Sequence, residues 1–429
     1  MSIKITNIFR GSVIFYFYVQ LSFVTSSVDD LGEVVFVNIL FRHGDRTPFS
    51  PYPKDPYRNS TYWPVGWGQL TDIGKRGHYE LGKWLRQRYS KLLPTKYNRD
   101  DIYIQSTDVD RTLMSAYSNL AGLYEPDPKT NWNPDIKWQP IPVHTSPQAS
   151  DMVLAANKSC PRYEFYLASL KSSDTFQKLN SENKELLEYI NKYTGLHIKE
   201  VWQLGDVYDT LFIEHLYNFT LPEWTSKIFP EPLRKWAAFS FTIPCYNRKM
   251  ARLKTGPLIS EMAMHMKKKI DGKLKPDRKA WIYSAHDTTV ANVLNTLGLF
   301  DTQCPPYLSL VLIELRKKND EYFVAIHFRN STTSQPFFMQ LPGCDKLCPF
   351  RKFSELISPV IPVDWEKECH LGFLSESLYD SVSGGSFLLS LSLTAVFLVF
   401  VLLGIRFYKR QYYNQSDFAY QSLKMDVHS

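Results

Sequence analysis

Short runs of apolar and β-branched residues predict the strands of a buried sheet. The run at 32–41 (GEVVFVNILF) is almost continuously apolar, which is typical of a strand covered on both faces. Similar runs at 101–106 and 280–285 are each followed by a stretch with helical spacing, at 109–123 and 288–299. Strand-then-helix units of this kind predict an α/β fold with a mostly parallel sheet covered by helices.

Two further runs predict a β-hairpin. They lie at 308–315 and 322–329 and flank the residues Lys318, Asn319 and Asp320. Asn and Asp accept the backbone conformations of tight turns more readily than most residues, so the turn is expected there.

The segment between the two groups of predicted strands has a different pattern. Residues 140–250 begin with proline-rich connections and continue with helical stretches at 169–193 and 230–239, without a strong strand run. We interpret this segment as a helical cap domain inserted into the α/β core, which residues 27–139 and 251–370 are expected to form.

The N-terminal segment 1–26 has the features of a secretory signal peptide. Lys4 and Arg10 accompany an uncharged apolar stretch at 11–24, and Val24-Thr25-Ser26 offers small residues for cleavage. An uncleaved signal anchor is the alternative interpretation.

A second apolar run predicts one transmembrane helix. Residues 386–405 carry no charge, and twenty residues at about 1.5 Å each span about 30 Å, the thickness of the hydrocarbon core. Basic residues directly after this run place the tail 406–429 in the cytosol. The polar tail also argues against a GPI signal. With 371–385 as a linker, the chain is expected to be a single-pass type I membrane protein with a luminal or extracellular domain.

Two kinds of short motif agree with this predicted topology. The tail segment Tyr420-Gln421-Ser422-Leu423 has the form of a sorting signal that endocytic adaptors read, although an unstructured tail is the alternative. The predicted location is therefore the lysosome, the endosome or the cell surface. Sequons for N-glycosylation stand in the luminal part at Asn59, Asn157, Asn218 and Asn330.

The composition is that of an ordinary globular protein. Hydrophobic residues make up 44% and charged residues 22% of the 429 positions, which excludes a disordered, collagen-like or coiled-coil chain. The mean hydropathy of −0.28 excludes a protein with many membrane spans. The net charge of +7 lies partly in the two ends of the chain, so no nucleic-acid footprint is visible.

Six cysteines in an exported chain predict three disulfides, for which fifteen pairings are possible. The spacing of Cys344 and Cys348 is also compatible with zinc, but no second pair or His-x3-His stands near enough in the sequence to complete a site.

Polar clusters follow the three best strands. They are Arg42–Pro48, Ser106–Arg111 and Ser284–Thr288. In an open α/β sheet ligands bind outside the carboxyl ends of the strands, where helix N-termini also offer N–H groups to anions. We therefore expect the three clusters to converge on one pocket.

The residues of these clusters suit a phosphate ester. Arginines bind phosphate oxygens with two N–H groups at once, and Arg42, Arg46 and Arg111 are available. A neutral imidazole at His43 is a nucleophile for phosphorus. Asp287 is a candidate acid for the leaving alkoxide, and this chemistry needs no metal. The neighbouring Asp45, Asp108 and Asp110 are interpreted as turn or N-cap residues, and Trp63 and Trp67 as core or rim.

Taken together, the clusters resemble a known family. The arrangement R-H-G-x-R-x-P at 42–48 matches the signature of the histidine acid phosphatases. Over residues 33–370 the chain is most similar to the prostatic and lysosomal members of that family. The segments that carry the likeness are Ser106–Ser115, Trp138–His144, Asn218–Pro222, Tyr283–Thr289 and Leu341–Cys344.

The resemblance implies roles for single residues. His43 resembles the nucleophile and Asp287 the proton donor, while Arg42, Arg46, Arg111 and His286 resemble the phosphate-binding shell. Trp202 resembles a tryptophan at the pocket mouth, and Trp138 and His144 match positions at a homodimer interface. The implied fold is phosphoglycerate mutase-like with an inserted helical cap, and no cofactor is implied.

The resemblance also implies disulfides. Cys160 with Cys369 and Cys344 with Cys348 fit the family pattern, whereas Ile213 and Leu310 occupy the positions of its third bridge. Cys245 and Cys304 are therefore expected to form a replacement pair.

The predicted activity is an acid phosphatase that hydrolyses phosphate monoesters through a phosphohistidine, with an acidic pH optimum. One alternative is a phytase-like phosphatase, whose polyanionic substrate would need more cationic residues. The other is a catalytically silent ectodomain that acts as a receptor or adhesion module.

Overall fold

A computed structural model describes residues 31–129, 131–331, 334–372 and 403–406. At its centre is a seven-stranded sheet with the order β2-β3-β1-β4-β5-β6, in which β7 also pairs with β5. The strands are β1 (Glu33–Arg42), β2 (Ile102–Ser106), β3 (Ala280–Ala285), β4 (Leu310–Lys318), β5 (Glu321–Arg329), β6 (Phe337–Met339) and β7 (Cys348–Pro349).

Only two of the six strand pairings are parallel. β3 runs parallel to both β1 and β2, whereas β4, β5, β6 and β7 make antiparallel pairings. The prediction of a mostly parallel sheet is therefore wrong. The reason is the β4–β5 hairpin, which is antiparallel by construction and joins the sheet antiparallel to β1. The predicted turn is confirmed, since Asn319 and Asp320 adopt positive φ angles of 51° and 63°.

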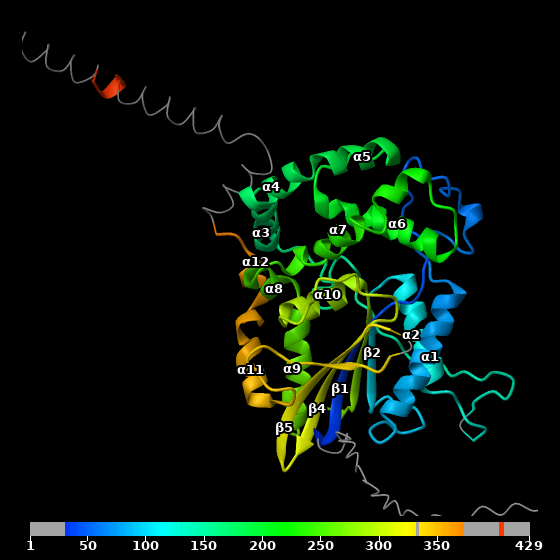
Figure 1. Cartoon of the computed structure of the whole chain (residues 1–429). Coiled ribbons are helices and arrows are strands. Elements are labelled where there is room, and N and C mark those ends of the chain that lie inside the picture. The colour runs from blue at the N-terminus through cyan, green and yellow to red at the C-terminus, as the bar shows by residue number, and fades with distance from the viewer. Residues whose placement is uncertain (1–30, 130, 332–333, 373–402, 407–429) are drawn as a thin grey trace, which may run out of the picture.

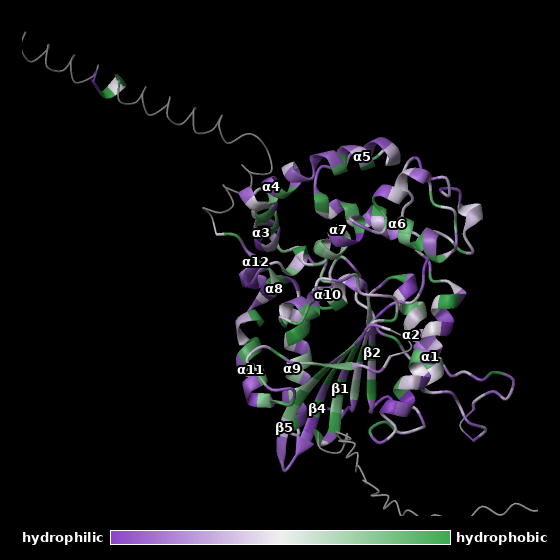
Figure 2. Cartoon of the chain, in the orientation of Figure 1, coloured by the Kyte–Doolittle hydropathy of each residue, from purple (hydrophilic) through white to green (hydrophobic). Residues whose placement is uncertain are grey.

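Helices cover both faces of the sheet (Figure 1). On one face lie α1 (Asp72–Arg88) and α2 (Asp110–Leu123), and on the other lie α9 (Gly256–Ile270) and α10 (Asp287–Thr296). The remaining helices of this layer are α8 (Arg248–Lys254), α11 (Phe350–Ile357) and α12 (Trp365–Cys369). In Figure 2 the strands are mainly hydrophobic and the outer surfaces of the helices mainly hydrophilic, as this layering requires.

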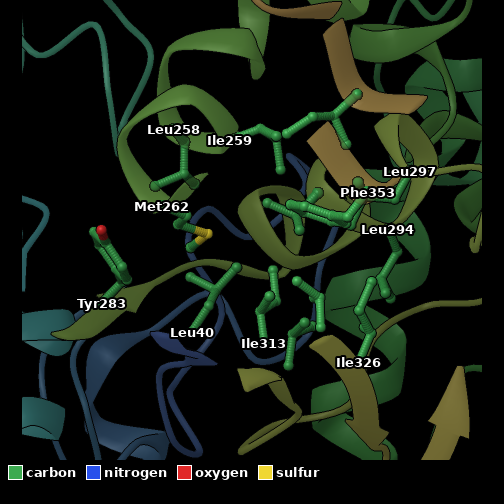
Figure 3. Close-up of a cluster of buried hydrophobic side chains, with 14 of the residues drawn as sticks. Leu40, Leu258, Ile259, Met262, Tyr283, Leu294, Leu297, Ile313, Ile326 and Phe353 are labelled. Carbon is green, nitrogen blue, oxygen red and sulfur yellow. The ribbon is translucent and has the colours of Figure 1, made fainter. Parts of the chain in front are cut away.

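Alternation along β1 builds two hydrophobic cores. Val37, Ile39 and Phe41 pack with side chains of α1 and α2, while Phe36 and Leu40 pack on the opposite face. Figure 3 shows Leu40 among side chains of α9, α10 and α11 in this second core. Burial on both faces fixes the register of β1, and with it the position of the polar cluster that follows.

Two glycines let α1 and α2 approach closely. A Cβ atom at Gly82 would lie 2.0 Å from the carbonyl oxygen of Asn119, and one at Gly122 would lie 2.0 Å from that of Tyr79. Neither distance is compatible with a side chain, so the two helices touch through their backbones. This contact matters for the site because the N-terminus of α2 carries Arg111.

Gly82→Ala is expected to destabilise the fold by about 1–3 kcal/mol, because α1 must move away from α2 to make room. Urea unfolding would measure the change. Gly66→Ala is the matched control, since a Cβ there meets only the Gln69 side chain, at 3.7 Å. Equal free energies of unfolding for the two variants would contradict this packing.

A group of helices lies over the carboxyl ends of the parallel strands (Figure 1). The stretch predicted as one helix at 169–193 is in fact divided, because α3 ends at Lys171 and Asn183 interrupts the rest. The helices are α3 (Pro161–Lys171), α4 (Asp174–Glu182), α5 (Lys184–Thr194), α6 (Leu204–Leu216) and α7 (Leu233–Ser240). We call α3–α7 the cap. The domain limits 27–139, 140–250 and 251–370 stay a prediction.

No helix in the part of the chain that the structure describes is long and apolar enough to cross a membrane. The segments predicted at the two ends lie wholly or mostly outside the described residues: they are the signal peptide 1–26, the linker 371–385, the span 386–405 and the tail 406–429.

Candidate active site

The three predicted polar clusters meet at one edge of the sheet. Arg42 pairs in register with Ala285, and Ser106 with Ser284, so β1, β2 and β3 end at the same level. The rings of His43 and His286 are consequently only 5.7 Å apart between centroids. The register of the parallel strands therefore brings together residues that lie far apart in the sequence.

The contacts and burial of His43 favour a neutral imidazole. Its Nδ1 lies 2.9 Å from the carbonyl oxygen of Gly44. A carbonyl only accepts, so Nδ1 carries the proton and Nε2 keeps its lone pair. Burial, followed by the charges of Arg42 and Arg46, lowers the pKa of His43 well below its usual value. The side chain, which is 1% exposed, thus remains unprotonated in acid.

Arg42 joins the first cluster to the third. Its guanidinium lies 2.7 Å from a carboxylate oxygen of Asp287 and donates to the carbonyl oxygen of Pro305 at 2.6 Å. It also stacks over the ring of Tyr307, 4.2 Å from the centroid. These contacts fix the orientation of a cation that is almost completely buried.

The cap orients the second arginine. Arg46 donates through both terminal nitrogens to the two carboxylate oxygens of Asp209 on α6, each at 3.0 Å. Burial alone would lower the pKa of Arg46, but the charge of Asp209 outweighs it and raises the pKa. Arg46 is therefore positively charged and held by two parallel hydrogen bonds.

Arg111 and His286 form a second contact across the site. An N–H of Arg111 approaches Nδ1 of His286 at 3.4 Å, and Nε2 of His286 lies 3.0 Å from the hydroxyl of Thr107. Since arginine only donates, Nδ1 accepts and Nε2 carries the proton. Burial and the charge of Arg111 lower the pKa of His286 to about 4. Burial and Arg46 lower the pKa of Arg111 to about 10.

Asp287 is the first residue of α10, and its Oδ1 accepts from the backbone N–H of Thr288 at 2.7 Å. Burial alone would raise its pKa, but the charges of Arg42 and Arg46 outweigh burial and lower it. Asp287 is consequently ionised in the site as it stands. Its protonation requires that another anion first engages the arginines.

A cavity of about 730 Å³ lies between the sheet edge and the cap, and His43 and His286 are not among the residues that line it. Arg42, Arg46, Arg111 and Asp287 line it, and so does the predicted rim residue Trp202. The ammonium of Lys171 lies 4.1 Å from the Trp202 ring centroid, a cation–π contact that holds the indole in place. Within the described ranges, no group of three or more His, Cys, Asp or Glu side chains is placed to hold a metal ion.

The sequence did not reveal several contributors to the site. Asp209, the carbonyl of Pro305, Tyr307 and Thr107 all contact the predicted residues. Thr107 stands inside a predicted cluster and was available as a candidate. Asp209 and Tyr307 carry no local signal, since their roles depend on how the cap and the loop before β4 fold back onto β1.

Two of the three predicted disulfides are present. Cys160 is bonded to Cys369, and Cys344 to Cys348. The predicted Cys245–Cys304 pair is wrong, because both residues are free thiols. Cys245 is buried in the core beneath α10 next to the hydroxyl of Thr255, whereas Cys304 packs against the cap and lines the cavity.

Two thiols per chain are therefore expected to react with a thiol reagent in denaturant without reductant, since all six cysteines lie in the described part of the chain. Mass spectrometry after alkylation would count them and place the label on Cys245 and Cys304. A chain without reactive thiols would contradict the structure.

Other predicted residues lie outside the cavity. His144 bridges to Gln105 on β2 and stacks on Tyr103 at 4.6 Å, and Trp138 is exposed. Of the sequon residues, Asn330 is partly buried and the others are exposed: Asn59, Asn157 and Asn218.

Comparisons with known proteins show the family to which the chain belongs. Residues 33–329 match the family model "Histidine phosphatase superfamily (branch 2)". The chain is 41% identical to the prostatic acid phosphatase of Homo sapiens over 343 residues, 79% of this chain and 88% of the relative. It is 40% identical to the human lysosomal acid phosphatase over 341 residues, 78% and 80% of the two chains.

Solved structures share the fold at lower identity. The apo phytase of Hafnia alvei superposes with a TM-score of 0.60 at 18% identity, covering 79% of this chain and 98% of its own. The phytase of Citrobacter braakii gives 0.59 at 17% identity, covering 79% and 100%.

Proposed function

Since this chain belongs to branch 2 of the histidine phosphatase superfamily, we propose that it hydrolyses phosphate monoesters through a phosphohistidine formed on His43. It is a phosphoric monoester hydrolase of the acid phosphatase type. The observation that carries the mechanism is the Nδ1–H···O=C bond from His43 to Gly44, because it directs the Nε2 lone pair away from the backbone and into a ring of arginines.

The arginines bind the phosphoryl group first. Arg42, Arg46 and Arg111 surround His43 closely enough to lower its pKa. Three guanidinium groups neutralise the charge on the equatorial oxygens of the phosphoryl group and hold the ester oxygen in line with Nε2. His286 supports this shell through Arg111, because its Nδ1 accepts from an N–H of that guanidinium at 3.4 Å.

Phosphate binding also prepares the acid. The phosphate takes over Arg42, which now pairs with Asp287, and adds its own negative charge nearby. Both changes raise the pKa of Asp287, which the charges of Arg42 and Arg46 otherwise hold below its ordinary value. Protonated Asp287 can then give its proton to the leaving oxygen, which favours an acidic optimum.

The proposed reaction has two chemical steps, phosphoryl transfer to His43 and hydrolysis of the phosphohistidine. Nε2 of His43 forms a bond to phosphorus as the ester P–O bond breaks, and the alkoxide leaves with the proton of Asp287. Water then attacks phosphorus, the P–N bond breaks, and the Asp287 carboxylate takes the proton of the water. Free phosphate departs, and both side chains return to their starting states.

The cavity does not favour the phytase-like alternative. Arginines and lysines that line it are nearly balanced by aspartates and glutamates: Arg42, Arg46, Arg111, Arg234 and Lys235 face Asp206, Asp209, Glu231 and Asp287. A substrate with many phosphates would need additional cations. A monoester with one phosphate fits this balance better.

The cellular setting follows from the ends of the chain. Its support is the sequence: a signal peptide at 1–26, a single span at 386–405 and the Tyr420–Leu423 signal for endocytic adaptors. We propose a lysosomal type I glycoprotein with sugars at the sequons. We also propose a homodimer, which the exposed Trp138 and the neighbouring exposed Trp132 support.

The full chain, purified in detergent, should hydrolyse p-nitrophenyl phosphate with a maximum in acid, and EDTA should leave the rate unchanged. Assays from pH 3 to 8 with and without EDTA would measure this. A folded protein with its disulfides intact that shows no turnover at any pH would overturn the proposed function.

A further inference from the structure

We call residues 42–50, which begin at the last residue of β1, the catalytic segment. The cap helix α6 and the residue that follows it contact this segment at three points. Asp209 on α6 binds Arg46, and the hydroxyl of Thr210 lies 3.5 Å from the carbonyl oxygen of Ser50. Just beyond the helix, Tyr217 donates to Asp45 at 2.9 Å. The segment that follows the catalytic motif therefore depends on α6 for its position.

Two carboxyl groups are buried in this same interface. Glu214 of α6 is completely inaccessible, and Asp55, in the segment beyond Ser50, is nearly so. No N–H or O–H of another described residue reaches either oxygen of Glu214 or Oδ2 of Asp55. The neighbouring hydroxyl of Tyr52 is buried and unpaired as well. The interface thus holds two acids without a cation to balance them.

Two ionised carboxylates without such a partner are very costly to bury side by side. A proton shared between them removes one charge and makes a hydrogen bond, as in other carboxyl pairs. We propose that Asp55 and Glu214 share one proton that docks α6 against the catalytic segment, and that loss of this proton in alkaline solution loosens the Asp209–Arg46 contact. Glu214 is in this view a positioning residue that acts on Arg46 through Asp209.

The surroundings agree with this assignment. Burial and the charge of Asp55 raise the pKa of Glu214 to about 9, and burial raises that of Asp55. The other titratable groups that face the pair are Tyr52 and Tyr57, and burial raises the pKa of each hydroxyl. Both hydroxyls stay neutral and bring no positive charge, so only a proton can compensate the pair.

The raised pKa of Glu214 makes the stability of the fold depend on pH. The native state keeps a proton that Glu214 loses in the unfolded chain above its ordinary pKa of 4.5. Stability from this group is therefore complete below 4.5 and falls as the pH rises toward about 9. The buried His43, His78, His265 and His286, whose pKa values are lowered, act in the opposite direction below about pH 6.5. The histidines contribute equally to wild type and to a variant at Glu214, so the difference in melting temperature between the two proteins reports on Glu214.

Glu214→Gln tests the proposal because the amide is uncharged at every pH. This inference rests on the proposed function, so the melting temperature is measured at pH 5 and pH 7.5, and KM for p-nitrophenyl phosphate at pH 5 and pH 9.5. We expect wild type and variant to agree at pH 5. At pH 7.5 the variant should melt several degrees higher, because the unfolded wild type has lost the proton that its native state keeps. At pH 9.5, where native wild type has lost the proton too, the variant should have a KM about three- to tenfold lower, with kcat changed much less.

Two further variants sharpen the result. Glu188→Gln, which removes an exposed carboxylate of α5 paired with Lys184, is the control and should follow wild type at every pH. Asp209→Asn combined with Glu214→Gln tests the route, since the KM gain should vanish while the higher melting temperature persists.

Identical pH profiles of KM and melting temperature for wild type and Glu214→Gln would overturn the proposal while leaving the proposed function intact. A lower melting temperature of the variant at pH 7.5 would overturn it too. Absence of turnover in all proteins, including wild type, would instead reject the proposed function.

Discussion

Replacing His43 by alanine is expected to lower kcat for p-nitrophenyl phosphate by at least about 10,000-fold, because the variant lacks the imidazole Nε2 that attacks phosphorus. Its neighbour His286 uses Nδ1 to accept from Arg111 and Nε2 to contact Thr107. Stopped assays with high enzyme concentrations at the acidic optimum would measure the residual rate.

Phosphate binding is the control for this variant. The arginines that bind the phosphoryl group keep their own partners when His43 is removed, since Arg42 is held by Pro305 and Arg46 by Asp209. Calorimetry should therefore show inorganic phosphate bound within about tenfold of the wild-type affinity. A variant that binds phosphate and keeps more than about a tenth of the wild-type kcat would contradict the nucleophilic role.

The second large effect concerns Asp287→Asn and depends on the leaving group. The amide cannot give up a proton, so hydrolysis of an alkyl phosphate should slow by about 100- to 10,000-fold. p-Nitrophenolate is stable enough to leave without a proton, so the loss with p-nitrophenyl phosphate should be smaller by at least about tenfold. The ratio of kcat/KM for the two substrates measures this selectivity.

Asp271→Asn is the matched control, since that exposed carboxylate pairs with Lys267 at the end of α9, away from the cavity. The control should reproduce the wild-type ratio. If Asp287→Asn slowed both substrates by the same factor, the residue would act by orienting Arg42 rather than by protonating the leaving group.

Local sequence patterns were sufficient to predict the site residues that directly follow the strands. Each of β1, β2 and β3 is a short apolar run followed by a polar cluster, and parallel register places the ends of these strands together. Arg42, His43 and Asp287 could therefore be located before any tertiary contact was known.

The same patterns do not show strand direction. An apolar run has the same pattern in a parallel and in an antiparallel strand, so β4 and β5 were identified as a hairpin while the antiparallel share of the sheet was underestimated. The division of the cap into α3, α4 and α5 was missed for a related reason, since the polar interruptions at Ser172 and Asn183 also occur within helices.

Residues whose role depends on cap docking could not be predicted. In the sequence Asp209 and Glu214 are acidic positions of a predominantly apolar segment, and nothing local shows that they meet the catalytic segment through α6. The predicted pairing of Cys245 with Cys304 was wrong for the same reason. The number of cysteines in a sequence does not show where each one lies, and here Cys245 lies in the core and Cys304 at the cavity.

The most direct test of the phosphohistidine is to trap it. Wild-type enzyme mixed with a ³²P-labelled monoester and quenched in alkali within milliseconds should carry a label that acid releases, as expected for a phosphorus–nitrogen bond. Peptide mapping should place the label on His43, and His43→Ala should carry none. Label on another residue, or steady turnover by His43→Ala at the wild-type rate, would contradict the account.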